Sequence, residues 1–266
     1  MRAPVSVRRG VLAAAGICLL LASSACSSDD SSSTPPTTRT LASQPSQAPD
    51  LSAYPPLPAP AAPASATVSC AYPPSSKSSK PVEAPSTDGV STAGTVGVAM
   101  ATSQGPIGLT LDRTEAPCTV NSFVSLAQQG YFDDTPCHRL VTSPGLQVLQ
   151  CGDPSGAGNG GPGYRFANEY PTTAFAEGDP AAQQGMLYPR GTIAMANSGP
   201  GGTNGSQFFL VYEDSVLPPQ YTLFGTISDE GLATIEKIAA EGDDGSMSAG
   251  GGKPNTPVQI ETVKVS

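Results

Sequence analysis

The segment at 191–209 constrains this chain most, because two short apolar stretches flank a loop built almost entirely of Gly, Asn, Ser, Thr and Pro, in the order GTIAMANSGPGGTNGSQFF. Residues 192–195 and 207–211 each predict a buried strand. The residues between them favour turns, since they adopt positive φ or bond their own backbone. A loop of this kind exposes backbone donors and acceptors beside apolar walls. Such a surface suits an extended peptide, which main-chain hydrogen bonds hold and side-chain pockets select.

The first 25 residues predict an export signal, because three arginines precede an apolar stretch at 11–21 and small residues follow it up to Cys26. The apolar stretch is shorter than the roughly 20 residues of a membrane-spanning helix. The run Ser23-Ser24-Ala25-Cys26 resembles the lipobox of bacterial lipoproteins, with Ser23 where that motif usually has Leu. We favour a lipoprotein with lipid on Cys26. An ordinary cleaved signal and an uncleaved anchor remain open, and all three place the folded part outside the cytoplasm.

Residues 26–94 are rich in Ser, Thr, Pro and Ala and hold few large apolar side chains. Such a segment cannot bury enough surface to offset its chain entropy, so the composition predicts a disordered linker. The prolines bias it toward extended conformations that would hold a domain away from a membrane surface. The alternative is a ligand for proline-reading modules, and we favour the linker.

The cysteine count and the charge limit the partners and the sites available. Four cysteines lie beyond the signal, an even number that indicates disulfides in an exported chain, with free thiols as the alternative: Cys70, Cys118, Cys137 and Cys151. With one histidine and no Cys-x-x-Cys pair, we expect no metal site. The formal net charge is −9, and the folded part has no basic run, which argues against nucleic acid as a partner.

From residue 95 the sequence changes to alternating apolar segments punctuated by glycine. Residues 96–100 and 107–111 predict a hairpin. Pro117 begins a predicted helix with apolar side chains at i, i+3, i+4 and i+7 from Val120, and Gly130 is placed to cap it. A second helix is predicted at 231–240 and a closing strand at 258–263. Further strands are predicted at 138–141, 146–151, 193–196, 207–211 and 222–227. Many short strands with two isolated helices indicate a closed antiparallel barrel rather than a parallel sheet.

The segment at 191–209, together with His138-Arg139 and the run Gln150-Cys151-Gly152-Asp153, closely resembles the cyclophilins, which are peptidyl-prolyl cis-trans isomerases. For residues 95–266 this resemblance implies a mainly β fold, a closed eight-stranded antiparallel β-barrel capped by two α-helices. In that fold Cys118 and Cys137 fall near the ends of neighbouring elements, so we favour a disulfide between them.

The reaction that the resemblance implies needs few reactive side chains, because no bond is made or broken and no cofactor is required. Rotation about the C–N bond of an X-Pro amide disrupts its resonance, which gives a barrier of about 18–20 kcal/mol. In the twisted transition state the prolyl nitrogen regains its lone pair, so a donor aimed at it stabilises that state selectively. By resemblance the donor is Arg139. The substrate-binding residues by resemblance are His138, Val148, Gln150, Ala196, Asn197, Ser198, Gln207, Phe209, Leu217 and Tyr221.

Several of these positions have a simpler interpretation. Val148, Phe209 and Leu217 are also what a barrel core would contain, since pocket and core are both apolar. Arg139 is also compatible with a surface residue paired with a carboxylate. The stretch between Arg139 and Gln150 is three residues longer than in the family, so the family's pocket phenylalanine falls at Leu146 or Gln147. Tyr221 stands where the family usually has histidine.

We therefore expect an exported isomerase of X-Pro bonds in proteins outside the cytoplasm, lipid-anchored or secreted, monomeric, and in contact with the membrane only through its N-terminal lipid. The rival is a binding module or chaperone that holds proline-containing segments with little or no turnover. Residues 156–161 match G-x-G-x-x-G by letter, but a nucleotide site needs a strand before the motif and a helix directly after it. An exported hydrolase is not supported, because the sequence places no plausible general base near a nucleophile.

Overall fold

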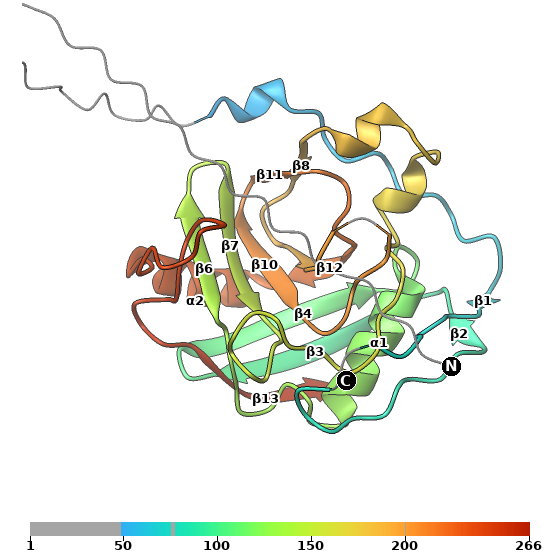
Figure 1. Ribbon diagram of the computed structural model, residues 1–266, viewed down its shortest axis with the longest axis horizontal. Coiled ribbons are helices and arrows are strands. Elements are labelled where there is room, and N and C mark those ends of the chain that lie inside the picture. The colour runs from blue at the N-terminus through green and yellow to red at the C-terminus, as the bar shows by residue number, and fades with distance from the viewer. Residues whose placement is uncertain (1–48, 76–77, 200) are drawn as a thin grey trace, which may run out of the picture. The chain divides into compact units, whose positions relative to one another are not determined.

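The computed structural model describes residues 49–75, 78–199 and 201–266. Their main feature is a curled antiparallel sheet of nine strands (Figure 1). In spatial order the strands are β5 (Thr135–Pro136), β13 (Gln259–Val265), β3 (Thr95–Thr102), β4 (Gly105–Asp112), β12 (Leu223–Ile227), β9 (Thr192–Met195), β10 (Phe208–Glu213), β7 (Leu146–Cys151) and β6 (Arg139–Ser143). The predicted hairpin at 96–111 and the predicted closing strand are confirmed as β3, β4 and β13.

The prediction of a closed eight-stranded barrel is confirmed only in part. The sheet has nine strands, because the two-residue β5 adds to the edge of β13, and the strand order ends at β5 and β6 without closing on itself. Two further pairs lie outside the main sheet: β1 (Thr67–Val68) with β2 (Val90–Ser91), and β8 (Met186–Tyr188) with β11 (Ser215–Leu217). The free edge of β6 is covered by the loop between the last helix and β13. Leu140 exchanges two backbone hydrogen bonds with Gly252 in that loop, at 2.8 and 3.0 Å.

Both predicted helices are present, as α1 (Pro117–Gln128) and α2 (Asp229–Ala240). α1 begins with a proline, whose missing N–H is harmless in a first turn, and is followed by Gly130 at φ +65°. Its N-cap residue Ala116 has no side-chain oxygen. Glu169 supplies the missing acceptors, because its carboxylate accepts hydrogen bonds from the backbone N–H groups of Cys118 and Thr119 at 2.9 and 2.8 Å.

α1 packs on β13 and β4, and α2 packs on β4, β10 and β6. The core beneath α1 is aromatic, with the ring of Phe123 4.9 Å from Phe132 and 5.4 Å from Phe208. A smaller apolar cluster, built around Val148, Tyr188 and Phe209, lies between the sheet and the β8–β11 pair. Three single turns of 3-10 helix complete the described chain: η1 (Leu51–Ala53), η2 (Thr172–Ala174) and η3 (Pro180–Gln183). None of the helices in the described residues is long and apolar enough to cross a bilayer.

The prediction of a disordered linker is wrong for residues 49–75 and 78–94, which pack on the domain. Cys70, Tyr72 and Val90 are buried in the main core. The Tyr72 hydroxyl donates to the carbonyl of Cys118 at 2.8 Å, and its ring packs edge-on against Tyr164 at 5.5 Å. The composition argument failed because this segment makes no core of its own and needs only a few apolar side chains to bind an existing one. The predicted signal at 1–25, Cys26 and the linker up to residue 48 lie outside the described residues.

The disulfide predicted between Cys118 and Cys137 is also wrong. Cys70 is bonded to Cys118, and Cys137 is bonded to Cys151. Cys137 and Cys151 lie at the adjacent ends of the paired strands β6 and β7, with their Cα atoms 4.0 Å apart. The predicted pairing relied on the expected nearness of Cys118 and Cys137 in the fold, whereas the segment that carries Cys70 packs on the domain and brings Cys70 to Cys118.

Candidate functional site

Arg139 begins β6, directly opposite Gln150 on β7. Three acceptors hold its half-buried guanidinium: Nη1 donates to Gln150 Oε1 at 3.1 Å, Nε to the carbonyl of Gly250 at 3.1 Å, and Nη2 to the carbonyl of Ala249 at 3.0 Å. A guanidinium has five N–H groups, so two remain for a ligand. Burial lowers the pKa of Arg139, while Tyr221 and Asp243 oppose the shift, and the group stays a cation at neutral pH.

Beside this guanidinium lies a pocket of about 170 Å³, here termed the apolar pocket. It is the right size for a small ring such as that of proline. Its walls come from six separate strands and loops, which explains why the residues are scattered along the sequence. Eight of the predicted residues are adjacent here or on its rim. The lining is Arg139, Leu146, Val148, Gln150, Ala196, Asn197, Phe209, Leu217 and Tyr221.

The sequence did not decide whether Leu146 or Gln147 takes the place of the family's pocket phenylalanine. In the structure, Leu146 lines the apolar pocket. Successive side chains of a strand point to opposite faces, so Leu146, Val148 and Gln150 share the face of β7 that borders the pocket. Gln147 faces away. The ring of Tyr221 packs edge-on against Phe209, with centroids 5.6 Å apart, so the pocket lining contains a second aromatic side chain next to Phe209.

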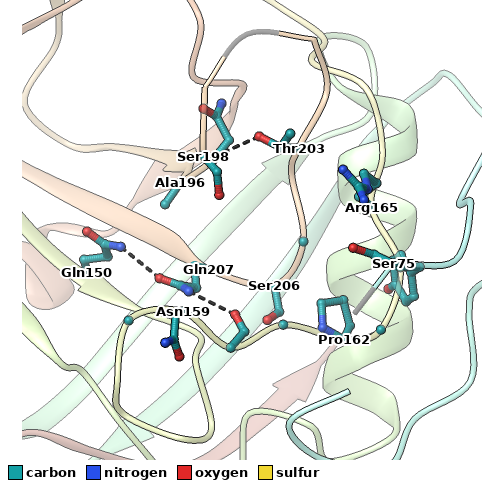
Figure 2. Close-up of a pocket in the computed structure, with 17 residues that line it drawn as sticks. Ser75, Gln150, Asn159, Pro162, Arg165, Ala196, Ser198, Thr203, Ser206 and Gln207 are labelled. Carbon is teal, nitrogen blue, oxygen red and sulfur yellow. Dashed lines mark hydrogen bonds between the residues drawn. The ribbon is translucent and has the colours of Figure 1, made fainter. Parts of the chain in front are cut away.

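A second cavity, of about 250 Å³, adjoins the first and shares Gln150, Ala196 and Asn197 with it (Figure 2). We term it the polar pocket. Gln150 donates to Gln207 Oε1 at 3.0 Å, and Gln207 donates to the carbonyl of Gly160 at 2.9 Å. These two amides therefore connect Arg139 to the glycine-rich loop through a chain of hydrogen bonds. Ser198 also lines this cavity. Five of the predicted substrate-binding residues therefore line it together: Gln150, Ala196, Asn197, Ser198 and Gln207.

The glycine-rich loop that resembles a nucleotide motif folds around a carboxylate of its own chain. Asp153 is fully buried and accepts four hydrogen bonds, from the N–H and hydroxyl of Ser155 at 2.8 and 2.7 Å and from the N–H groups of Gly158 and Gly160 at 2.8 and 2.9 Å. Burial raises the pKa of Asp153, but these hydrogen bonds outweigh it and lower the pKa overall. The loop thus binds an internal anion, and among the described residues no helix directly follows it.

His138, which was predicted to bind substrate, is not among the residues that line either cavity. It is 4% exposed, precedes Arg139 on the opposite face of the chain, and lies beneath Gly158. Burial lowers the pKa of His138, which keeps the imidazole neutral. Its contribution is therefore to packing under the loop. No group of His, Cys, Asp and Glu side chains in the described residues is arranged to hold a metal ion.

Sequence reasoning missed several residues that line the polar pocket or hold Arg139. Ala249 and Gly250 act through backbone carbonyls, which leave no side-chain signal. Ser75 belongs to the segment that was assigned to the linker. Asn159, Arg165 and Thr203 lie in loops whose course the periodicity of apolar residues does not reveal. The glycine-rich composition of 156–161 was the one available signal for this part of the site.

Comparisons with known proteins agree with this geometry. The family model "Cyclophilin type peptidyl-prolyl cis-trans isomerase/CLD" matches residues 97–265. The chain is 58% identical over 213 residues to the probable peptidyl-prolyl cis-trans isomerase B of Mycobacterium tuberculosis H37Rv, covering 79% of this chain and 68% of that protein. It is 58% identical over 202 residues to the corresponding Mycobacterium leprae protein, covering 74% and 67%. A crystal structure of a Cryptosporidium parvum cyclophilin type isomerase superposes with a TM-score of 0.52 at 28% identity, covering 65% of this chain and 98% of that one. This chain is a member of the cyclophilin-type peptidyl-prolyl cis-trans isomerase family.

Proposed function

We propose that this isomerase acts outside the cytoplasm on X-Pro bonds in flexible polypeptide segments, with Arg139 as the catalytic donor. One observation carries the proposal: the guanidinium of Arg139 borders the apolar pocket that Phe209 and Leu217 also line. A proline ring seated in that pocket has its nitrogen facing the only cation among the lining residues. The two free N–H groups of Arg139 are then available to the reacting amide.

In this mechanism one part of the substrate is held still while the other part rotates. The apolar pocket holds the proline ring by excluding water from it, while Gln150 and Asn197 offer amide groups to the substrate backbone. The rest of the substrate rotates about the C–N bond. As the amide twists, the prolyl nitrogen becomes a hydrogen-bond acceptor, and Arg139 donates to it. A hydrogen bond to a charged group contributes about 1.5–3 kcal/mol, which corresponds to roughly 10- to 100-fold in rate.

The fixed orientation of Arg139 matters as much as its charge. Its contacts to Ala249, Gly250 and Gln150 restrict the guanidinium before the substrate arrives. An exposed arginine would lose its rotamer freedom in the transition state, which would cost part of the stabilisation. The loop that carries Ala249 and Gly250 is therefore part of the catalytic apparatus in this proposal.

The location outside the cytoplasm is supported by the two disulfides, because such bonds persist in oxidising compartments. The leader at 1–25 and the lipobox-like run before Cys26 support an exported, lipid-anchored protein that faces outward. We propose that the protein acts as a monomer. Mass measurement of the mature N-terminus tests the anchor: a diacylglyceryl cysteine at Cys26 is expected, and an unmodified terminus elsewhere leaves a secreted form.

The isomerase proposal is tested on the full chain by exchange NMR of a short X-Pro peptide, with peptide affinity measured alongside. Wild type should accelerate exchange, and Arg139→Ala should lose at least tenfold in kcat with less change in affinity. Arg113→Ala is the matched control, since Arg113 follows β4 and lines neither pocket. Peptide binding without accelerated exchange in wild type would instead identify a binding module.

A further inference from the structure

The loop between α2 and β13 lies beside β6 and supplies two of the three acceptors that hold Arg139, the carbonyls of Ala249 and Gly250 (Figure 1). Both of these residues are exposed, and Gly and Ser make up most of the surrounding chain at 245–252. Such a segment has few side chains to pack, and glycine leaves its backbone unusually free. Other contacts must therefore keep the two carbonyls at fixed positions.

Asp244 closes this loop at its base. Its backbone N–H donates to the carbonyl of Lys253 at 3.0 Å, and its side-chain Oδ1 accepts from the N–H groups of Lys253 and Ser246 at 2.8 and 3.0 Å. One carboxylate oxygen thus connects the two ends of the loop. The approach is close, because a Cβ atom on Gly252 would overlap this same oxygen.

Beyond its base, the loop is attached to the edge of β6. Gly252 exchanges two backbone hydrogen bonds with Leu140, the residue that follows Arg139. Gly251 has φ +69°, and a Cβ atom on it would overlap the carbonyl oxygen of Leu140. The N–H of Met247 donates to the carbonyl of Gly251 at 3.0 Å, which closes the turn that presents the two acceptors to the guanidinium.

We propose that Asp244 is a positioning residue for the reaction, because it fixes the loop whose carbonyls orient the guanidinium of Arg139. Asp244 is not among the residues that line either pocket, so its effect on the reaction passes through the loop. Gly251 positions the same loop by allowing it to approach β6. This inference rests on the proposed function, since it assumes that Arg139 is the catalytic donor.

The expected effect is smaller than that of removing the guanidinium. Without the Asp244 carboxylate the base of the loop opens, but Arg139 keeps Gln150 as an acceptor. The guanidinium then spends part of its time in orientations that do not face the prolyl nitrogen. We expect kcat to fall about three- to tenfold, while KM stays within about twofold because the residues that hold the substrate are unchanged.

The first test measures isomerisation of a short X-Pro peptide by exchange NMR, with the full chain carrying Asp244→Ala or Asp244→Asn. Both side-chain hydrogen bonds at the base go to Oδ1, so Asn keeps that acceptor while it removes the charge. Asp244→Ala should show the full loss of kcat, and Asp244→Asn should recover to within about twofold of wild type. Asp112→Ala is the matched control, because Oδ1 of Asp112 closes a similar turn with Thr114 and lines neither pocket of the site.

The second test displaces the loop from β6 without changing its base. Gly251→Ala should also lower kcat about three- to tenfold, because the added methyl group pushes the loop away from Leu140. Gly245→Ala is the matched control within the same loop. Gly245 has φ +62° and open space around it, so the substitution adds similar backbone strain without an overlap and should lower kcat less.

A third test separates positioning from a general loss of structure. In an Arg139→Ala background, Asp244→Ala should leave the residual rate within about twofold, since no guanidinium remains to be oriented. The Nε–H of Arg139, which donates to Gly250 at 3.1 Å, should give an NMR signal protected from solvent exchange in wild type and in Asp244→Asn. That protection should be lost in Asp244→Ala.

A kcat for Asp244→Ala within twofold of wild type would overturn the inference, as would an equal loss in Asp244→Asn or an unchanged Nε–H signal in Asp244→Ala. The NMR signal decides the matter where the residual rate of Arg139→Ala is too slow to measure. It also distinguishes the two failures. Full activity in Arg139→Ala would refute the proposed donor, whereas the Nε–H signal reports the orientation of Arg139 whether or not the peptide is isomerised.

Discussion

Asp153 offers the sharpest test of how the site is held together, and we expect Asp153→Asn to destabilise the fold and slow catalysis. Its Oδ2 accepts hydrogen bonds from the N–H groups of Gly158 and Gly160, while Oδ1 accepts from Ser155. Asn keeps the size of the side chain and one acceptor oxygen. Its NH₂ group, however, then faces two N–H donors that have lost their acceptor.

The magnitude follows from those two bonds. A hydrogen bond to a charged group contributes about 1.5–3 kcal/mol, and the low end applies where water can reach the loop, so losing two costs about 3 kcal/mol of unfolding free energy. Urea unfolding followed by circular dichroism measures it, since the chain has no tryptophan for fluorescence. We also expect kcat/KM to fall severalfold, because Gly160 in this loop accepts the hydrogen bond from Gln207.

The pH dependence has a definite sign. The pKa of Asp153 in the folded protein is lowered from its ordinary value of 3.8, so its contribution is complete above about pH 5 and is lost as pH falls through the lowered pKa. The stability difference between wild type and Asp153→Asn should therefore shrink in acid. Asp112→Asn is the matched control, because Asp112 makes the same turn to Thr114 with one oxygen only, which Asn retains. Equal losses in the two variants, or a loss below about 1 kcal/mol in Asp153→Asn, would refute this reasoning.

Two further predictions concern the elements on either side of the site. Replacing both Cys137 and Cys151 with Ser opens a cross-link between residues 14 apart, and loop entropy predicts a loss of about 3 kcal/mol in urea unfolding without reductant; a loss below 1 kcal/mol would argue that the strand pair alone fixes this region. Glu169→Gln should cost about 2 kcal/mol, because one amide group then faces the N–H and hydroxyl of Thr119 at the start of α1. Thermal unfolding of Glu169→Gln that matches wild type would contradict its role as the helix cap.

Strands and helices could be predicted from the sequence wherever a regular spacing of apolar residues coincided with a buried face. The alternation at 96–111 predicted β3 and β4, and the i, i+3, i+4 spacing after Pro117 predicted α1, because each element presents one apolar face to a common core. The pocket residues were found through the resemblance rather than through such patterns. Val148 and Phe209 look like core by composition, and only their position beside Arg139 distinguishes them.

What could not be predicted involves contacts between segments that carry no periodic signal. Tyr72 and Cys70 bind a domain that lies beyond them in sequence, so local composition gave the wrong state for their segment. The carbonyls of Ala249 and Gly250 hold Arg139 through backbone atoms that every residue possesses. Arg165 acquires its place in a pocket only when the chain on either side of it folds.

The central claim is that a fixed guanidinium at residue 139, and not positive charge alone, stabilises the twisted amide. Exchange NMR of an X-Pro peptide with Arg139→Lys tests it most directly, because lysine keeps the charge but cannot form the planar fork that Gln150, Ala249 and Gly250 orient. The account predicts that kcat falls at least tenfold while KM stays within about threefold of wild type. A kcat in Arg139→Lys equal to that of wild type would contradict it.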